Sequence, residues 1–474
     1  MSYSTSRKSE IKHEYLRNIK RFASVYDRTK ETVVLLPGGM GSQLERSKKR
    51  YQNDASLPFR TYNPVWMDLG LLFSNDTLKL EMQASKRDKG NHIIVPEGPL
   101  RFLVTAYDGT EHYFREHGFN YIVFPYDWRR SLDESGSYLL YFLQRLQTIV
   151  KARKGHDPLP STSLVCHSMG GLVALRFLQR LRVRSGFRPQ HITRWLKRIV
   201  TVATPFYGTS THMHRYYRGE KLLNILHGEQ KVARIAASFD GPYILSYLNH
   251  PTYESYKAAF NRRGDTPELP RYPLRDAADP DNQIADPSDS AMLGRYPPWV
   301  SARYLSDTRG LWRILSKRLP KAFQDRLFHI RAVKQSTWTE QHWKDIDGSS
   351  YDPQSQKSPL VRGAIGQGDG TVPFWSARLA QTPDSQIYSV SNDVEHGKLM
   401  EHDEVLHAVD KIVTTGIKPT SSIRRKTYHG QRLASPTRAA QFVNDVRAGT
   451  ATRDDERATD PMIWRRILEE TTLC

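Results

Sequence analysis

The chain has 474 residues, 38% of them hydrophobic and 11% aromatic, which is enough for one large domain with insertions or for two domains and excludes a disordered protein. Lys and Arg outnumber Asp and Glu by 70 to 50, a formal net charge of +20, and such a surface attracts anionic partners. The basic residues are spread widely, which argues against a dedicated nucleic-acid stripe, and an ordinary solvated surface is the alternative to any binding site.

The polar start of the chain and its cysteines bear on localisation. Two cysteines, Cys166 and Cys474, are too few for a disulfide framework, which favours a reducing compartment. Residues 1–30 are polar, lack the pattern of a secretory signal, and are predicted to form an N-terminal extension. No run approaches the roughly 18 apolar residues of a membrane-spanning helix. We expect a cytoplasmic protein with peripheral contact at an anionic membrane.

Short apolar runs, typical of strands buried on both faces, recur along the chain. They lie at residues 32–36, 121–124, 162–166, 198–203, 327–333 and 386–390. Helical patterns lie between several of them, notably at 138–154 and 171–181. This alternation predicts an α/β fold with a mostly parallel central sheet flanked by helices.

Two long stretches interrupt the alternation, and the end of the chain differs in composition. Residues 47–100 and 212–320 are predicted insertions, either functional lids or linkers, within a domain spanning 31–413. Residues 414–474 are rich in Ser, Thr and Arg and are predicted to form a basic tail.

The segment Val165–Gly171 carries the strongest functional signal. A β-prone run leads into it and a helix-forming run leads out, so it resembles the strand–turn–helix of a nucleophile elbow. Such an elbow would present the Ser168 hydroxyl as a nucleophile and place the Met169 amide at a helix N-terminus, where it can meet a developing oxyanion. The alternative, a serine in an ordinary turn, explains less of the pattern.

A serine nucleophile needs a base and an orienting acid, which in this fold follow it in the order acid, then histidine. Asp369, between two glycines, is the best acid, although a surface turn or a calcium-loop fragment is the alternative. His396, shortly after the last strand run, is the best base; His402 and His407 compete but have helical spacing.

A second backbone donor for the oxyanion is expected beside Met169. The loop Pro37–Ser42 directly follows the first strand run, and Met40 is its candidate donor. A phosphate-binding loop is the alternative, but the segment lacks the Lys-Ser/Thr ending that holds nucleotide phosphates.

Six motifs occur in order: Val34–Glu45, Phe124–Arg129, Cys166–Gly171, Ala203–Thr209, Gly368–Pro373 and Glu395–Gly397. Together they resemble the lecithin:cholesterol acyltransferase family, which includes phospholipid:diacylglycerol acyltransferases and a lysosomal phospholipase/transacylase. The resemblance implies an α/β-hydrolase fold with lid and cap insertions, a triad of Ser168, Asp369 and His396, and oxyanion amides from Met40 and Met169. It also implies a lid from residue 64 onward and a cap segment at 235–248.

Aromatic, acidic and histidine side chains are further candidates. Trp66 and Trp128 are candidates for lining an acyl-chain groove, with core packing as the alternative. Asp127 precedes the serine and is expected to pair with Arg129 or Arg130. His212 and His214 form a His-x-His pair without a third ligand, so we expect no metal, and no motif indicates a cofactor.

These observations favour a serine acyl hydrolase or transacylase that takes an acyl group from a phospholipid and passes it to an alcohol or to water. The alternatives are a soluble esterase or thioesterase for small acyl substrates, and a non-catalytic binding protein on a hydrolase scaffold. The sequence does not identify the acceptor or the oligomeric state.

Overall fold

The computed structural model describes residues 3–46, 64–66, 80–88, 93–100, 107–219, 228–247, 257–258, 274–276, 296–315, 317–339, 341–343, 360–362 and 365–419. Within them, a six-stranded sheet has the order β14-β9-β7-β6-β1-β5. Every adjacent pair in this sheet is parallel. Its strands are β1 (Thr32–Leu36), β5 (Asn120–Val123), β6 (Thr162–His167), β7 (Arg198–Val202), β9 (Leu327–Ala332) and β14 (Ile387–Val390).

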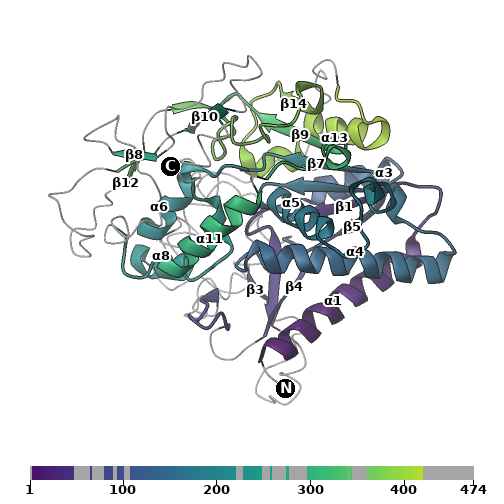
Figure 1. Cartoon of the computed structure of the whole chain (residues 1–474), viewed down its shortest axis with the longest axis horizontal. Helices are drawn as coiled ribbons and strands as arrows, with labels where there is room; N and C mark the ends of the chain where they lie inside the picture. The colour runs from purple at the N-terminus through teal and green to yellow at the C-terminus, as the bar shows by residue number, and fades with distance from the viewer. Residues whose placement is uncertain are drawn as a thin grey trace, which may run out of the picture.

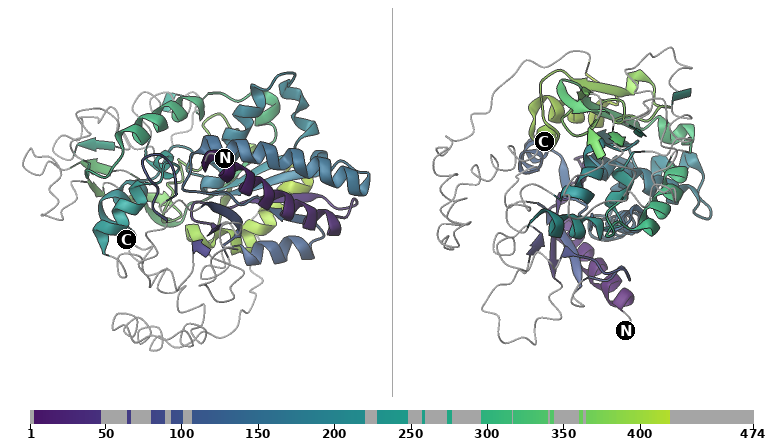
Figure 2. Two further views of the ribbon diagram at one scale, coloured as in Figure 1. Left: turned by 90° about the horizontal axis from the view of Figure 1, so that it is seen from below. Right: turned by 90° about the vertical axis from the view of Figure 1, so that its left-hand side faces the viewer.

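Helices cover both faces of this sheet (Figures 1 and 2). α4 (Leu132–Lys154), α5 (Met169–Arg182) and α11 (Ala302–Leu315) belong to one layer, and α3 (Asp108–Glu116) and α13 (Asp403–Thr415) to the other. Side chains alternate along a strand, so Val34 joins the core beneath α4 and α5 while Val33 joins the core beneath α3 and α13. The predicted α/β fold with a parallel sheet flanked by helices is confirmed.

The first 25 residues contain a helix that their polar composition does not reveal. α1 (Tyr3–Val25) packs along α4 (Figure 1). Its buried residues Ile11, Tyr15 and Ile19 recur every four positions, which places them on one face of the helix. The Tyr15 hydroxyl donates to the Pro125 carbonyl across 2.9 Å, so this helix is joined to the loop after β5.

The stretch predicted as the first insertion contributes to a second, smaller sheet. β2 (Ser42–Arg46) pairs antiparallel with β3 (Pro64–Trp66) and with β4 (Ile94–Pro99). Residues 47–63, 67–79, 89–92 and 101–106 lie outside the described residues. The part that is described places Trp66 beside the loop that follows β1.

The second insertion, predicted at 212–320, contains most of α6 (Ser210–Arg218), α8 (Glu229–Ala237), the short helix η6 (Pro242–Leu245), β8 (Leu274–Asp276) and α11, with a small core of its own. The remaining elements are β10 (Gln335–Trp338), β11 (Gln341–Trp343), β12 (Leu360–Arg362), β13 (Ile365–Gly368), α12 (Lys321–Gln324) and the short helices η4 (Leu159–Ser161), η5 (Pro189–Arg194), η7 (Asp384–Gln386) and η8 (His396–Glu401).

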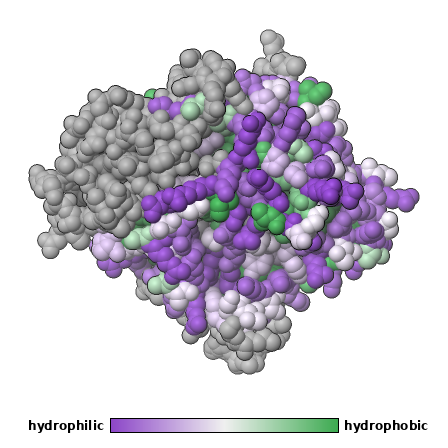
Figure 3. Space-filling view, viewed as in Figure 1, coloured by the Kyte–Doolittle hydropathy of each residue, from purple (hydrophilic) through white to green (hydrophobic). Residues whose placement is uncertain are grey.

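The described residues bear only in part on the predicted basic tail and on the predicted absence of a membrane-spanning helix. The tail lies outside the described residues from 420 onward, and the insertion boundaries stay predictions. No helix in the described ranges has both the length and the apolar character to cross a membrane. The face over α4, α5 and α11 is mostly hydrophilic (Figure 3).

Candidate active site

Ser168 occupies a strained turn between β6 and α5. Its backbone has φ 50° and ψ −126°, and its amide donates to the Val202 carbonyl across 2.8 Å. A Cβ added at Gly170 would lie 2.5 Å from the carbonyl oxygens of both Leu36 and Pro37. The turn therefore requires a glycine at position 170. Cys166 is fully buried, where a small side chain fits, and burial raises the pKa of its thiol.

The structure brings together the three side chains predicted to act with each other. His396 Nε2 lies 2.9 Å from Ser168 Oγ, and His396 Nδ1 lies 2.7 Å from Asp369 Oδ2. A carboxylate accepts hydrogen bonds, so Nδ1 carries the proton and the Nε2 lone pair faces the serine hydroxyl. This arrangement can draw the proton from the serine oxygen and return it to a leaving group.

The Asp369 carboxylate is held in place by its own loop. Its Oδ1 accepts from the amides of Thr371 at 3.0 Å and Val372 at 2.6 Å. Its carbonyl accepts from the His396 amide at 2.9 Å, so the acid and the histidine are joined by backbone as well as by side chain. The Asp369 side chain is 1% exposed and that of His396 is 16% exposed, so the outer end of the pair is the one that reaches solvent.

The loop after β1 packs against the elbow. A Cβ built at Gly38 would lie 3.0 Å from the Ser168 Cβ, and one built at Gly39 would lie 3.5 Å from the Met169 sulfur. Met40 has φ 64°, and its carbonyl accepts from Trp66 Nε1 across 2.8 Å. The two segments predicted to supply oxyanion amides thus lie side by side at Ser168. Their donor role stays a prediction.

Both candidate groove tryptophans are buried behind this loop. Trp66 and Trp128 are each 3% exposed, and their rings contact edge to face with centroids 5.3 Å apart. Trp128 Nε1 donates to the Ser42 carbonyl at 3.3 Å. These contacts make both residues supports of the loop, as the core-packing alternative implies. Contact with an acyl chain stays a prediction.

Asp127 forms the ion pair expected of it, within a larger buried network. Arg129 Nε and Nη2 donate to the two Asp127 oxygens at 2.9 and 2.8 Å, and Arg7 Nη2 of α1 donates at 3.0 Å. Burial alone would raise the pKa of Asp127, but the Arg129 guanidinium and its hydrogen bonds hold it well below its usual range. The same Arg129 binds Asp88 at 2.9 Å, which joins residues 80–88 to the Asp127 loop.

Two further residue groups hold the loop of His396 and were not identified from the sequence. Glu404, at the start of α13, accepts from the Ser391 amide at 2.6 Å and from the Tyr388 hydroxyl at 2.8 Å. His167 Nε2 lies 3.2 Å from the His396 carbonyl. The sequence offered one signal for this histidine, its place directly before the nucleophile.

Within the described residues, no group of three or more His, Cys, Asp or Glu side chains is arranged to hold a metal ion. His212 is buried and bonds to Tyr216 at 2.9 Å, and burial lowers its pKa well below the usual value. The structure does not place it beside the serine–histidine–aspartate group.

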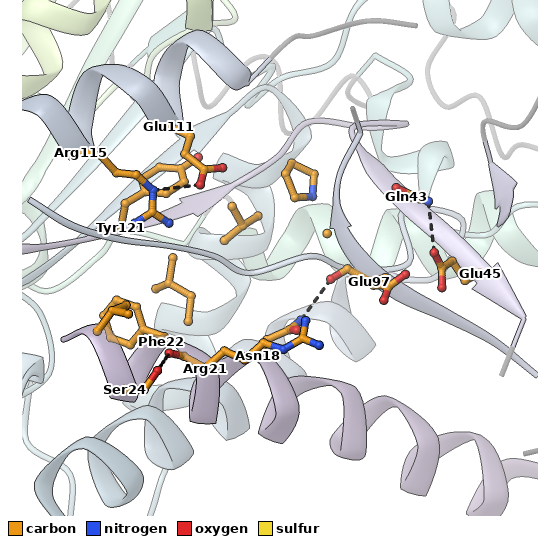
Figure 4. A pocket seen from close by; sticks show the side chains of 15 residues that line it. Asn18, Arg21, Phe22, Ser24, Gln43, Glu45, Glu97, Glu111, Arg115 and Tyr121 are labelled. Carbon is orange, nitrogen blue, oxygen red and sulfur yellow. Dashed lines mark hydrogen bonds and ion pairs between the residues drawn. The ribbon is translucent and has the colours of Figure 1, made fainter. Parts of the chain in front are cut away.

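An open cavity of about 770 Å³ lies elsewhere, between α1, β2, β4, α3 and β5 (Figure 4). Its lining includes Arg21, Glu97, Glu111 and Arg115, and it contains none of the three active-site side chains. Glu111 pairs with Arg115 at 2.9 Å, and the Glu97 carbonyl accepts from Asn18 at 3.1 Å. We therefore treat this cavity as separate from the candidate site.

Comparison with known proteins converges on the same segment. Residues 114–246, which include β6, Ser168 and α5, match the model of the lecithin:cholesterol acyltransferase family. This segment is similar to that family. The resemblance read from the six motifs is thereby confirmed for the part of the chain that contains the elbow.

Two relatives show how far the similarity to the family extends. The human lysosomal phospholipase A and acyltransferase is 28% identical over 176 residues, which cover 31% of this chain and 42% of that protein. The lecithin-cholesterol acyltransferase-like 1 protein of Arabidopsis thaliana is 32% identical over 101 residues, 21% of this chain and 22% of that protein. The chain thus spans less than half the length of these family members.

A solved structure that resembles this chain has lower sequence identity to it than the relatives above. A chain of the Tle4-Tli4 complex covers 82% of this chain and 99% of its own length, with 16% identity and a TM-score of 0.48. The family resemblance therefore rests on the sequence matches, and the fold on the sheet order and helix layers described above.

Proposed function

We propose that this protein is a serine-dependent acyl hydrolase or transacylase that acts on lipid esters. The observation that carries the proposal is the hydrogen-bonded series Asp369–His396–Ser168, with distances of 2.7 and 2.9 Å, at the elbow of a parallel sheet. The similarity of the elbow segment to that family supports a lipid ester as the acyl donor. The proposed location is cytoplasmic, with peripheral contact at anionic membranes.

In the proposed first step, Ser168 Oγ attacks the ester carbonyl carbon and its proton moves to His396 Nε2. Asp369 holds the Nδ1 proton and stabilises the imidazolium that forms. The carbonyl oxygen becomes an oxyanion, for which the Met40 and Met169 amides are the proposed donors. Loss of one such donor costs about 2.7–4 kcal/mol of transition-state stabilisation in enzymes of this kind.

The tetrahedral intermediate then breaks the ester C–O bond, and His396 gives its proton to the departing alcohol oxygen, which for a phospholipid donor leaves as a lysophospholipid. An acyl-serine remains. In the second half, His396 takes a proton from water or from an acceptor alcohol as its oxygen attacks the acyl carbon. The bond from that carbon to Ser168 Oγ then breaks, His396 returns the proton to Oγ, and a fatty acid or a new ester is released. Water gives a phospholipase, and an alcohol gives an acyltransferase.

Labelling with a fluorophosphonate probe tests the nucleophile. The wild type should be labelled on one serine, and Ser168→Ala should not be labelled. Ser163→Ala is the matched control, because Ser163 lies in β6, the strand that leads to Ser168, and is also buried. Labelling that persists in Ser168→Ala would overturn the assignment.

Acyl release from phospholipid vesicles, with and without an added alcohol, tests the substrate class. The proposal predicts release that is faster on anionic vesicles and weakens as salt screens the positive surface. Turnover of small soluble esters without turnover of vesicles would indicate the esterase alternative. No turnover of either, with no labelling, would indicate a binding protein.

A further inference from the structure

His167, the residue before the nucleophile, is buried and bonded at both ring nitrogens. It is 5% exposed, and its Nε2 lies 3.2 Å from the His396 backbone carbonyl. Its Nδ1 lies 2.8 Å from the Tyr107 hydroxyl, which in turn lies 2.8 Å from the Gly38 amide nitrogen. Ring centroids of His167 and His396 are 5.0 Å apart.

The partners fix the direction of every hydrogen bond in this series. A backbone carbonyl only accepts, so His167 donates from Nε2 to His396, and its Nδ1 is then the bare nitrogen. The Tyr107 hydroxyl therefore donates to Nδ1 and accepts from the Gly38 amide. Burial, together with the neighbouring His396, lowers the pKa of His167 to about 3, so the ring stays neutral in the form that these bonds require.

The series joins the two loops that meet at Ser168. At one end is Gly38, in the loop that leads to Met40; at the other is the main chain of His396. The His396 amide is already bonded to the Asp369 carbonyl at 2.9 Å, so the bond from His167 holds the opposite side of the same residue. A Cβ at Gly41 would lie 2.8 Å from the Tyr107 oxygen, so this ring also fills the space inside the loop.

We propose that His167 and Tyr107 are positioning residues that hold His396 and the loop after β1, which contains Gly38, in place beside Ser168. They affect the rate of acyl transfer rather than the binding of substrate. The inference rests on the proposed function. Misplacement of reacting groups by about 1 Å can slow a reaction about 100-fold, so rigid support of two loops matters for rate.

His329 provides a matched comparison. It too is buried with its pKa lowered to about 3, chiefly by burial, and both of its nitrogens are bonded, to Thr201 at 2.7 Å and Thr382 at 2.9 Å. It differs in that its partners are Thr201 of β7 and Thr382 of the segment between β13 and β14, and neither belongs to the loops that carry Gly38 or His396. A substitution there measures the cost of losing a buried histidine without removing a bond to those two loops.

The test is the rate of fluorophosphonate labelling of Ser168, separated into the maximal rate and the probe concentration at half-maximal rate. Tyr107→Phe, which keeps the ring, should lower the maximal rate about ten-fold or more and leave the half-saturating concentration unchanged. His167→Leu should lower the maximal labelling rate further, because it removes both hydrogen bonds of the ring. His167→Gln should recover part of the rate, because its amide can donate to the His396 carbonyl.

Thermal unfolding of the same variants and of His329→Gln is the control. The inference predicts that His329→Gln lowers stability without lowering the maximal labelling rate. It is overturned if Tyr107→Phe is labelled at the wild-type rate, or if all variants lose rate in proportion to stability. A wild type that is not labelled at all would instead contradict the proposed function.

Discussion

The candidate nucleophile and one residue of the loop after β1 are held in backbone conformations that residues with a side chain rarely adopt. Ser168 has φ 50° and Met40 has φ 64°. Each such residue costs about 1–3 kcal/mol, and the strain persists only where surrounding contacts impose it. Here the Ser168 amide is bonded to Val202 and the Met40 carbonyl to Trp66. The strain lies where the loop after β1 and the elbow meet.

The glycine after the elbow gives a direct test at this scale. Gly170→Ala places a methyl group 2.5 Å from two backbone oxygens that cannot move independently of β1. We expect a loss of about 1–3 kcal/mol in the free energy of unfolding and slower labelling of Ser168. Urea unfolding and labelling rates measure both effects.

Gly310→Ala is the matched control for this substitution. A Cβ at Gly310 meets nothing within 4 Å, and the residue lies within α11. It should stabilise the protein by up to about 1 kcal/mol. A neutral effect at Gly170 would contradict the described geometry of the turn.

Local patterns predicted the serine, acid and histidine, because an elbow, a Gly-Asp-Gly loop and a histidine after the last strand each have a short signature. The structure brings these three together, although nothing in the sequence fixed their distances. Tyr107 and His167 were not predicted to interact, because their hydrogen bond joins residues 60 positions apart and depends on the tertiary fold. Hydrogen bonds of that kind produce no periodic pattern in the sequence.

At the scale of elements, a buried ionic network joins α1 and the start of α4 to the Asp127 loop and residues 80–88. Arg7, Arg129 and Arg130 face Asp88 and Asp127, all of them almost fully buried. An intact buried ion pair adds little to the free energy of unfolding, but removal of one partner leaves an uncompensated buried charge and is strongly destabilising. The network therefore fixes how α1 packs more than it adds net stability.

Asp127→Asn tests this network and its pH dependence. Arginine neighbours outweigh burial and hold the pKa of Asp127 below that of the unfolded chain, so the ionised form stabilises the folded protein above about pH 4. This stabilisation is lost as the pH falls through the lower, folded pKa. We expect Asp127→Asn to cost about 3–5 kcal/mol at pH 7 and to flatten the acid dependence of stability.

Urea unfolding between pH 2 and 7 measures both quantities. Asp325→Asn is the control, because Asp325 forms an exposed pair with Lys321 at 2.8 Å and should change stability by less than about 1 kcal/mol. If the free energy of unfolding of Asp127→Asn depends on acid pH as strongly as that of the wild type, the pKa of Asp127 is not lowered in the folded protein.

The alternation of apolar strand runs and helices predicted the main sheet, since buried parallel strands are continuous apolar segments. The helix α1 was not predicted, because its buried face is a narrow stripe within a polar sequence. The second sheet was not predicted either. β3 has only three residues, and both β3 and β4 pair with β2 across a long stretch of chain, so their pairing depends on tertiary contacts.

At the scale of the whole molecule, the parallel sheet gathers distant parts of the chain at one end. The loops after β1, β6 and β14 carry Met40, Ser168 and His396. The carboxyl ends of parallel strands share one edge, so these three loops meet there. Asp369 follows β13, which pairs with β10 outside this sheet, and it joins the group through its bonds to His396. The net charge of +20 is a separate property of the molecule, which supports approach to anionic surfaces.

The most direct test of the central claim is detection of the acyl-serine itself. The protein is mixed with vesicles of a phospholipid that carries one defined acyl chain, quenched in acid within a turnover, and analysed by intact mass and peptide mapping. If Ser168 is the nucleophile, the peptide that contains it should gain the mass of that acyl group, and this adduct should be removed by hydroxylamine and be absent from Ser168→Ala. Acyl release at full rate with no adduct on Ser168, or an adduct on another residue, would contradict this role of Ser168.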